Sequence, residues 1–316
     1  MKIVVTDGHT LNPGDLDNSE LEKLGELVIY KRSNREETIL RLQDADIAVV
    51  NKTILDRDIL EKLPHLRYIA VTATGYNNLD VPFIKEKKIP TSNVTNYGSY
   101  AVAQHAFALL LELTNLVGLH NQECRQGKWY QSSDFCFWSQ PMTELYGKKI
   151  GIIGLGHIGS KMAEMAKAFG MEVFYHGRVD KNIPGYTYLS TPQEIFSSCD
   201  VISLHCALNE QTNQIVNSAS LSYFKPNAIL INTSRGGLIQ EEDLLNALDQ
   251  GQIRGVGLDV LSEEPPRKLN SLINHPRCIV TPHNAWAAQE TRQRMLDITI
   301  DNIKSFLQGN PKNLIP

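Results

Sequence analysis

The feature that most constrains the fold is an apolar run that ends in a Gly-x-Gly-x-x-Gly motif, followed at once by an amphipathic segment, Ser160–Phe169. Strand, tight turn and helix start in this order are typical of dinucleotide binding. The first glycine permits the turn, the second lets backbone approach a pyrophosphate, and the third allows close helix–strand packing. The helix start adds free N–H groups and a positive dipole. The predicted cofactor-binding residues of this turn are Gly154, Gly156, His157, Ile158 and Gly159.

The residues after the motif favour this interpretation over a glycine turn with only a structural role. Met162, Met165, Ala166 and Phe169 recur at helical spacing and form one apolar face. Gly170 follows where glycine commonly ends a helix. We therefore expect a helix here, with that face turned toward the core.

Composition narrows the class of protein. A chain of 316 residues has room for about two domains. The formal net charge of −4, without any basic block, argues against nucleic-acid binding, and no apolar stretch approaches the roughly 20 residues of a membrane span. The first residues show no signal-peptide pattern. Five scattered cysteines without a Cys-x-x-Cys pair favour free thiols and no metal site, so we expect a cytoplasmic protein.

Strand-like and helix-like segments alternate along the chain, which favours parallel sheets with helices on both faces. The first series has predicted strands at Ile3–Thr6, Glu26–Tyr30, Ile47–Asn51, Tyr68–Thr72 and Pro90–Asn93, and predicted helices near Arg35–Gln43, Ile59–Leu63 and Pro82–Lys87. The second series runs through Tyr100–Leu116, Ile150–Gly154, Val173–His176, Val201–Cys206, Ala228–Thr233, Gly255–Leu261 and Cys278–Thr281. Between the two series, Gln126–Tyr146 is aromatic-rich and irregular.

Because the glycine motif lies in mid-chain, we expect one domain to be inserted into another. The expected fold is α/β, with two Rossmann-like, doubly wound parallel-sheet domains. Residues 99–288 would form the dinucleotide-binding domain. Residues 1–98 and 289–316 would form the substrate domain, to which a last helix, Gln289–Gln308, returns. A cleft between two such lobes is a natural place for a small substrate beside a cofactor.

The end of the strand after the glycine motif bears on cofactor choice. An NAD-specific site normally has an acidic residue there, which accepts from the adenosine ribose 2′-OH. In this chain the position is Gly177, followed by Arg178, whose guanidinium suits a 2′-phosphate. NADP(H) is therefore mildly favoured over NAD(H). The alternative is a solvated arginine, with Asp180 reaching the ribose.

Three later strands end in polar residues, where open parallel sheets bind ligands. Arg235 stands beside two glycines, Glu264 follows Glu263 before two prolines, and His283 follows Pro282. Any one of these would more often be a cap or a surface residue. An arginine, an acid and a histidine at three successive strand ends are instead typical of a catalytic site.

With these motifs the chain resembles the D-isomer-specific 2-hydroxyacid dehydrogenase family over nearly its whole length. The matching segments are the mid-chain glycine motif, Leu204–Asn209, Asn232–Gly236, Asp259-Val260 with Glu264-Pro265, and Thr281–His283. Ala73–Asn77, Asp134–Trp138 and Ala285-Trp286 resemble the glycerate dehydrogenase (hydroxypyruvate reductase) branch. Two residues depart from the family pattern: Ala207 replaces a usual proline, and Gly177 replaces the usual acid.

The resemblance implies reduction of a small 2-keto acid of the hydroxypyruvate or glyoxylate type to the D-2-hydroxy acid, with hydride from NAD(H) or NADP(H). His283 would be the acid–base group, oriented by Glu264, and Arg235 would bind the substrate carboxylate. Asp259 would accept from the nicotinamide carboxamide. Backbone N–H groups at Thr74 and Gly75 would hold the substrate from the other lobe. Further cofactor-lining residues would be Cys206 and Thr233.

Other features have less specific interpretations. His205 lies in an apolar strand and is expected to be packed and hydrogen-bonded, and His105 continues a helical face. The aromatic segment Phe135–Trp138 suits either the core or, preferably, the interface of a homodimer. Two rival functions stay open. One is a nucleotide-sensing protein like the C-terminal binding protein corepressors, and the other is a formate- or phosphite-type dehydrogenase of the same family.

Overall fold

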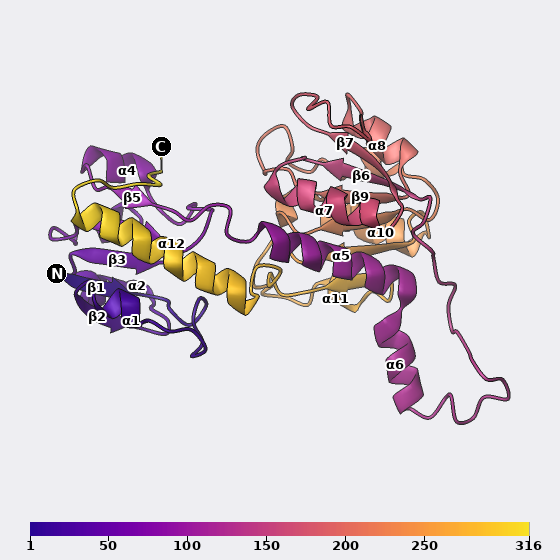
Figure 1. Ribbon diagram of the computed structural model, residues 1–316, viewed down its shortest axis with the longest axis horizontal. Helices are drawn as coiled ribbons and strands as arrows, with labels where there is room; N and C mark the ends of the chain where they lie inside the picture. Colours follow the sequence, from indigo (N-terminus) through magenta and orange to yellow (C-terminus); the bar gives the residue numbers. More distant parts are fainter. Residues whose placement is uncertain (316) are drawn as a thin grey trace. The chain divides into compact units, whose positions relative to one another are not determined.

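The computed structural model describes residues 1–315. The chain forms two compact units, shown in Figure 1. Unit 1 comprises Met1–Tyr97 together with the chain from Ala287 onward, and unit 2 comprises Gly98–Trp286. Unit 2 is thus an insertion between two parts of unit 1.

Unit 1 is built on a parallel five-stranded sheet with the order β2-β1-β3-β4-β5. Its strands are β1 (Lys2–Val5), β2 (Glu26–Ile29), β3 (Ile47–Val50), β4 (Tyr68–Val71) and β5 (Thr91–Ser92). Its helices are α1 (Ser19–Glu22), α2 (Arg35–Leu42), α3 (Arg57–Leu60), α4 (Val81–Glu86) and α12 (Gln289–Leu307). Every residue of β3 and β4 is buried, as expected for apolar strands of a parallel sheet covered on both faces.

Unit 2 has a parallel seven-stranded sheet with the order β12-β11-β10-β9-β6-β7-β8. Its strands are β6 (Lys149–Ile153), β7 (Glu172–His176), β8 (Tyr186–Tyr188), β9 (Val201–Leu204), β10 (Ile229–Asn232), β11 (Gly255–Leu258) and β12 (Cys278–Val280). Its helices are α5 (Ser99–Asn115), α6 (Val117–Arg125), α7 (His157–Ala168), α8 (Pro192–Ser198), α9 (Ser218–Leu221), η1 (Gly236–Leu238, 3-10), α10 (Glu241–Asp249) and α11 (Ser271–Asn274). The strand order reverses between β6 and β9, and open parallel sheets bind ligands at the carboxyl ends of the strands at such a point.

The predicted α/β fold with two parallel sheets is confirmed. One boundary prediction was wrong, because α7 begins at His157 and not at Ser160. The helix can start inside the glycine motif because N–H groups of a first helical turn need no intrahelical partner. Met162 and Ala166 are fully buried, as predicted, but Phe169 lies beyond the helix end and is 49% exposed. Strand β8 and the helices α1, α6, α8, α9, α10 and α11 were not predicted.

Helix α6 and the irregular segment after it form an arm (residues 117–146) that extends away from the rest of unit 2 (Figure 1). Within the arm, Glu123 accepts from Ser139 Oγ at 2.7 Å and pairs with Lys128 at 2.8 Å. Its aromatic side chains are largely exposed, including Tyr130 at 96% and Phe135 at 89%, so the alternative of a core segment is wrong.

Among residues 1–315, no helix is by itself long and apolar enough to cross a membrane. Helices α5 and α6 reach that length and composition only together, across a bend of 57°.

Candidate active site

The glycine turn between β6 and α7 has the shape that a pyrophosphate requires. Gly154 has a φ of +96°, and a Cβ there would lie 2.5 Å from the amide nitrogen of Cys206. A Cβ on Gly159 would lie 2.3 Å from the Gly154 carbonyl oxygen, so helix and strand pack closely. A Cβ on Gly156 would meet nothing within 4 Å. The second glycine therefore borders open space, and no side chain of the described residues caps α7 there.

The end of β10 contributes an unsatisfied hydroxyl to the same edge of the sheet. Thr233 is 8% exposed, and its Oγ1 is the single buried side-chain N or O atom within residues 1–315 that has no hydrogen-bond partner. Buried polar atoms are almost always bonded, so an orphan hydroxyl is a place for a ligand group. Next to it, Ser234 Oγ donates to the Cys206 carbonyl at 2.7 Å, which ties the ends of β10 and β9 together. These residues fit a dinucleotide.

Two neighbouring residues, the predicted lining residue Cys206 and the packed His205, have no reactive chemistry of their own. Burial raises the pKa of the Cys206 thiol to about 11, so the thiol stays protonated and is a poor nucleophile. Burial also lowers the pKa of His205 to about 4. Its Nε2 lies 2.8 Å from Ser203 Oγ, which confirms the interpretation of His205 as a packed, hydrogen-bonded residue.

The loop after β7 carries the groups that bear on cofactor choice. A Cβ at Gly177 would meet nothing within 4 Å, so this position is open for a ligand or a larger side chain. Arg178 is exposed and has no hydrogen bond or ion pair within the described part of the chain. None of the described carboxylates therefore pairs with its positive charge.

The same loop holds Asp180 in another role than the one considered from sequence. Its carboxylate accepts from the Tyr175 hydroxyl and from the Asn182 amide, the latter at 2.8 Å. The bond from Tyr175 lowers the pKa of Asp180, so hydrogen bonds inside the loop stabilise its carboxylate. The structure thus gives no support to a ribose contact from Asp180. Sequence analysis missed Lys181, whose Nζ donates to the Leu155 carbonyl of the glycine turn at 2.6 Å.

The segment with Arg235 lies directly against the segment with Glu264. A Cβ on Gly236 would lie 2.0 Å from the carbonyl carbon and oxygen of Leu261, so only glycine permits this approach. Asn232 Nδ2 donates to the Arg235 carbonyl at 2.8 Å, which fixes the turn. The Arg235 guanidinium is exposed, donates to the Ser234 carbonyl at 2.7 Å, and forms no ion pair with any described residue.

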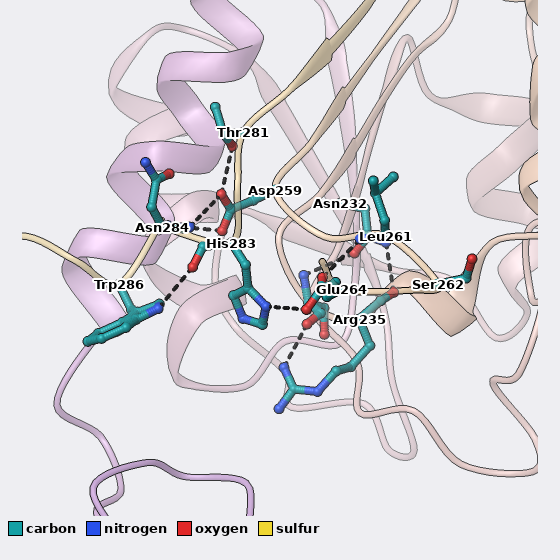
Figure 2. A network of polar contacts seen from close by, with 12 residues as sticks. Asn232, Arg235, Asp259, Leu261, Ser262, Glu264, Thr281, His283, Asn284 and Trp286 are labelled. Carbon is teal, nitrogen blue, oxygen red and sulfur yellow. Dashed lines mark hydrogen bonds and ion pairs between the residues drawn. The ribbon is translucent and has the colours of Figure 1, made fainter. Parts of the chain in front are cut away.

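Glu264 and His283 form a bonded pair (Figure 2). His283 Nδ1 lies 2.6 Å from Glu264 Oε2, and the other oxygen, Oε1, accepts from the Leu261 amide at 2.9 Å. Because a carboxylate only accepts, the geometry assigns the hydrogen to Nδ1 and leaves Nε2 for a reacting group. Both side chains are about one-third exposed, at 32% for His283 and 34% for Glu264, so the pair is accessible to substrate.

The backbone of His283 is held in an unusual conformation. Its φ is +51°, in the left-handed region that non-glycine residues rarely adopt. Asp259 stabilises this turn: its carbonyl accepts from the His283 amide at 2.8 Å, and its carboxylate accepts from the amides of Asn284 and Ala285 at 3.0 and 2.9 Å. Trp286 Nε1 donates to the His283 carbonyl at 3.0 Å (Figure 2). Asp259 is 1% exposed, so its first role in the structure is to shape this loop.

The structure thus brings Arg235, Glu264 and His283 to one edge of the sheet of unit 2. The two substrate-binding residues predicted in the other domain lie in unit 1, in the loop after β4. There Thr74 Oγ1 donates to the Val94 carbonyl at 2.9 Å, and the Thr74 carbonyl accepts from Asn93 Nδ2 at 2.8 Å. Gly75 follows in the same loop, half-buried. No cluster of three or more potential metal ligands occurs within residues 1–315.

Comparisons with known proteins identify the family of the chain. A family model described as D-isomer specific 2-hydroxyacid dehydrogenase, NAD binding domain, matches residues 107–285. A hydroxypyruvate reductase of Blautia hydrogenotrophica is 45% identical over 323 residues, which cover 100% of this chain and 99% of the relative.

Two solved structures are similar over the whole chain. An acyclic imino acid reductase in complex with NADPH and D-arginine is 34% identical, with a TM-score of 0.86 and 100% of both chains covered. An NADPH-dependent glyoxylate/hydroxypyruvate reductase of Sinorhizobium meliloti, in complex with citrate, is 30% identical, with a TM-score of 0.85 and 99% and 97% of the two chains covered. The family model spans more than half of the chain, and the resemblance noted in the sequence is confirmed. The chain belongs to the D-isomer-specific 2-hydroxyacid dehydrogenase family of NAD(P)-dependent oxidoreductases.

Proposed function

We propose that this protein reduces a small 2-keto acid of the hydroxypyruvate or glyoxylate type to the D-2-hydroxy acid. The observation that carries the proposal is the bonded pair of Glu264 and His283 beside Arg235, a cation that has no carboxylate partner among the described residues. A proton donor and an unpaired guanidinium at one sheet edge match the two needs of a keto acid, which are protonation at oxygen and recognition of its carboxylate.

The residues of the site divide the work of the reaction. Arg235 binds the substrate carboxylate with its planar fork and draws electron density from the neighbouring C2 carbonyl. His283, protonated on both ring nitrogens and held by Glu264, donates the Nε2 proton to the carbonyl oxygen as that oxygen gains negative charge. The bound nicotinamide cofactor supplies the hydride that C2 receives. In the reverse direction, neutral His283 takes the hydroxyl proton.

The cofactor is held, on this proposal, by the glycine turn, the first turn of α7 (His157, Ile158), Thr233 and the loop after β7. We propose a preference for NADP(H). Gly177 leaves room for a 2′-phosphate without acidic repulsion, the guanidinium of Arg178 has no partner among the described residues, and Lys181 places an ammonium group at the glycine turn. The carboxamide of the nicotinamide would donate to the Asp259 carboxylate, which already accepts hydrogen bonds from the backbone amides of Asn284 and Ala285.

The quaternary structure that we propose is a homodimer. The arm exposes Trp129, Tyr130, Phe135 and Trp138 by 55% to 96%, far more apolar surface than isolated side chains present. A second copy of the chain would bury these aromatics, which are typical of interface centres.

The five cysteines are free, which fits a reducing cytoplasm.

Steady-state kinetics with a panel of substrates tests the reaction. Hydroxypyruvate, glyoxylate, pyruvate, formate and phosphite would each be assayed with NAD(P)H or NAD(P)⁺ by nicotinamide absorbance. Turnover of 2-keto acids, with His283→Ala lowering kcat by about two to four orders of magnitude, is the expected result. Turnover of formate or phosphite alone would favour the related dehydrogenases, and binding of the cofactor without any turnover would favour a sensing protein.

The ratio of kcat/KM for NADPH and NADH tests cofactor choice. Arg178→Ala should weaken NADPH binding by roughly 1.5–3 kcal/mol and leave NADH nearly unchanged, because only the phosphate contact is lost. Gly177→Asp fits the open position and should shift preference toward NADH. The matched control is Lys167→Ala, since Lys167 lies on the outside of α7 over Tyr186. A preference for NADH of about a hundredfold in the unmodified enzyme, roughly 2.7 kcal/mol, would contradict the proposed phosphate site.

A further inference from the structure

A second histidine lies beside the loop that carries His283. His105, on the long helix α5, has its Nε2 atom 2.9 Å from Thr281 Oγ1 and 3.5 Å from Asp259 Oδ1. Its side chain is 24% exposed, whereas Asp259 is 1% exposed. None of the roles proposed above involves His105. It nevertheless contacts Thr281, which precedes the turn of His283, and Asp259, which binds the amides after it.

The sequence of β11 allows α5 to come this close. A Cβ on Gly257 would lie 2.9 Å from the Cβ of Leu109, which follows His105 by one helical turn. That contact is tighter than side chains tolerate, so a larger residue in β11 would push the helix away. The small residue in the strand therefore sets the distance from His105 to the ends of β11 and β12.

The direction of the hydrogen bonds follows from the partners. Thr281 Oγ1 lies 2.6 Å from Asp259 Oδ1, and a carboxylate can only accept, so the hydroxyl hydrogen points to Asp259. The hydroxyl oxygen then accepts from His105, whose Nε2 carries the hydrogen. The chain of bonds thus runs from His105 through Thr281 to Asp259. Asp259 in turn accepts from the amides of Asn284 and Ala285. Figure 2 shows the contacts of Asp259 with Thr281 and Asn284.

We propose that His105 is a positioning residue that holds His283 in its left-handed conformation through Thr281 and Asp259. A non-glycine residue at a φ of +51° persists only where surrounding contacts hold it, and this chain of bonds contacts both sides of that turn. If His105 is lost, Thr281 and Asp259 can rotate and the turn relaxes, which moves His283 Nε2 away from its place. The inference rests on the proposed role of His283 as proton donor.

Two substitutions of the same histidine test the inference. His105→Leu removes the donor and should lower kcat by about three- to tenfold, which corresponds to about 0.65–1.4 kcal/mol, the usual contribution of one hydrogen bond. His105→Gln places an amide nitrogen near the position of Nε2 and should restore kcat to within about twofold of the unmodified enzyme. KM for the keto acid should stay unchanged in both variants, because Arg235, the proposed carboxylate-binding residue, lies outside this chain of bonds.

Matched substitutions of Thr281 keep the test decisive if His105→Leu fails to fold. Thr281→Val should lower kcat as His105→Leu does, whereas Thr281→Ser should have the kcat of the unmodified enzyme. In the double variant His105→Leu/Thr281→Val, the rise in activation free energy should be smaller than the sum of the rises in the two single variants. Equal kcat in all variants, with only a lower melting temperature, would overturn the inference. His283→Ala is measured beside them: normal kcat there would instead refute the role of His283 itself.

Discussion

Gly236→Ala is the substitution for which the structure predicts the sharpest effect. The added Cβ would lie 2.0 Å from the Leu261 carbonyl group and 2.4 Å from the Ser262 amide nitrogen, whereas ordinary contact begins at 3.4 Å. All of these atoms belong to backbone, so no side chain can turn aside. The segment of Arg235 and the segment of Glu264 must separate by about 1.4 Å. Overpacking of this kind costs about 1–3 kcal/mol of stability, and a misplacement of about 1 Å at a catalytic group can cost about a hundredfold in rate.

The assay compares kcat for hydroxypyruvate, Kd for NADPH and the free energy of unfolding in urea. Gly236→Ala should lower kcat by about 10- to 100-fold, while NADPH binding changes little because the glycine turn lies elsewhere in the sheet. The control is the adjacent Gly237→Ala, whose Cβ would meet only side-chain atoms, the nearest of them a methyl group of Leu208 at 2.9 Å, and this flexible side chain can move. If both variants kept the kcat and stability of the unmodified enzyme, the close approach of the two segments would not be what positions Arg235.

Three further predictions concern the substrate, pH and assembly. Arg235→Lys should raise KM for the keto acid and lower kcat together, since an ammonium group cannot copy the bidentate fork; unchanged kinetics would assign Arg235 a structural role. Burial lowers the pKa of His205 to about 4, against about 6.5 in an unfolded chain, so the unfolded state binds more protons between these values. The fold should lose about 2–3 kcal/mol as pH falls from about 6.5 to 4, and His205→Gln should reduce this loss in urea titrations at each pH. Phe135→Ser with Tyr130→Ser should convert a dimer into monomers in sedimentation experiments, whereas the same change at Tyr223, exposed outside the arm, should not.

The sequence predicted the parallel sheets because their signal is local. Short apolar runs such as Ile47–Asn51 and the glycine motif are each visible within a few residues, and alternation with helical segments implies a parallel sheet. The three catalytic candidates could be found for the same reason. Each follows an apolar strand within a few residues, and the carboxyl ends of parallel strands share one edge. The roles of Arg235, Glu264 and His283 stay predictions until the kinetic tests are made.

Contacts between distant side chains could not be predicted in this way. The Tyr175 hydroxyl donates to the Asp180 carboxylate inside the loop after β7. No periodicity in the sequence indicates this bond, so the sequence alone could not exclude Asp180 as a partner of the ribose. Lys181 reaches the carbonyl of Leu155 across 26 positions of the chain. The arm is a related case: its aromatic composition suits a core as well as an interface, and only the exposure of its side chains separates the two.

His105 shows most clearly why a site extends beyond its motif. On α5 it occupies one position of a helical face, and its partners Thr281 and Asp259 follow more than 150 residues later. They meet because Gly257 lets the helix lie close to β11, which is a property of packing between two elements and not of either alone. A proton donor needs an exact place as well as the right chemistry, since rate falls steeply with misplacement. The residues that position the His283 side chain belong to the helix and strands beneath the loop. The placement of this side chain therefore depends on the core of unit 2.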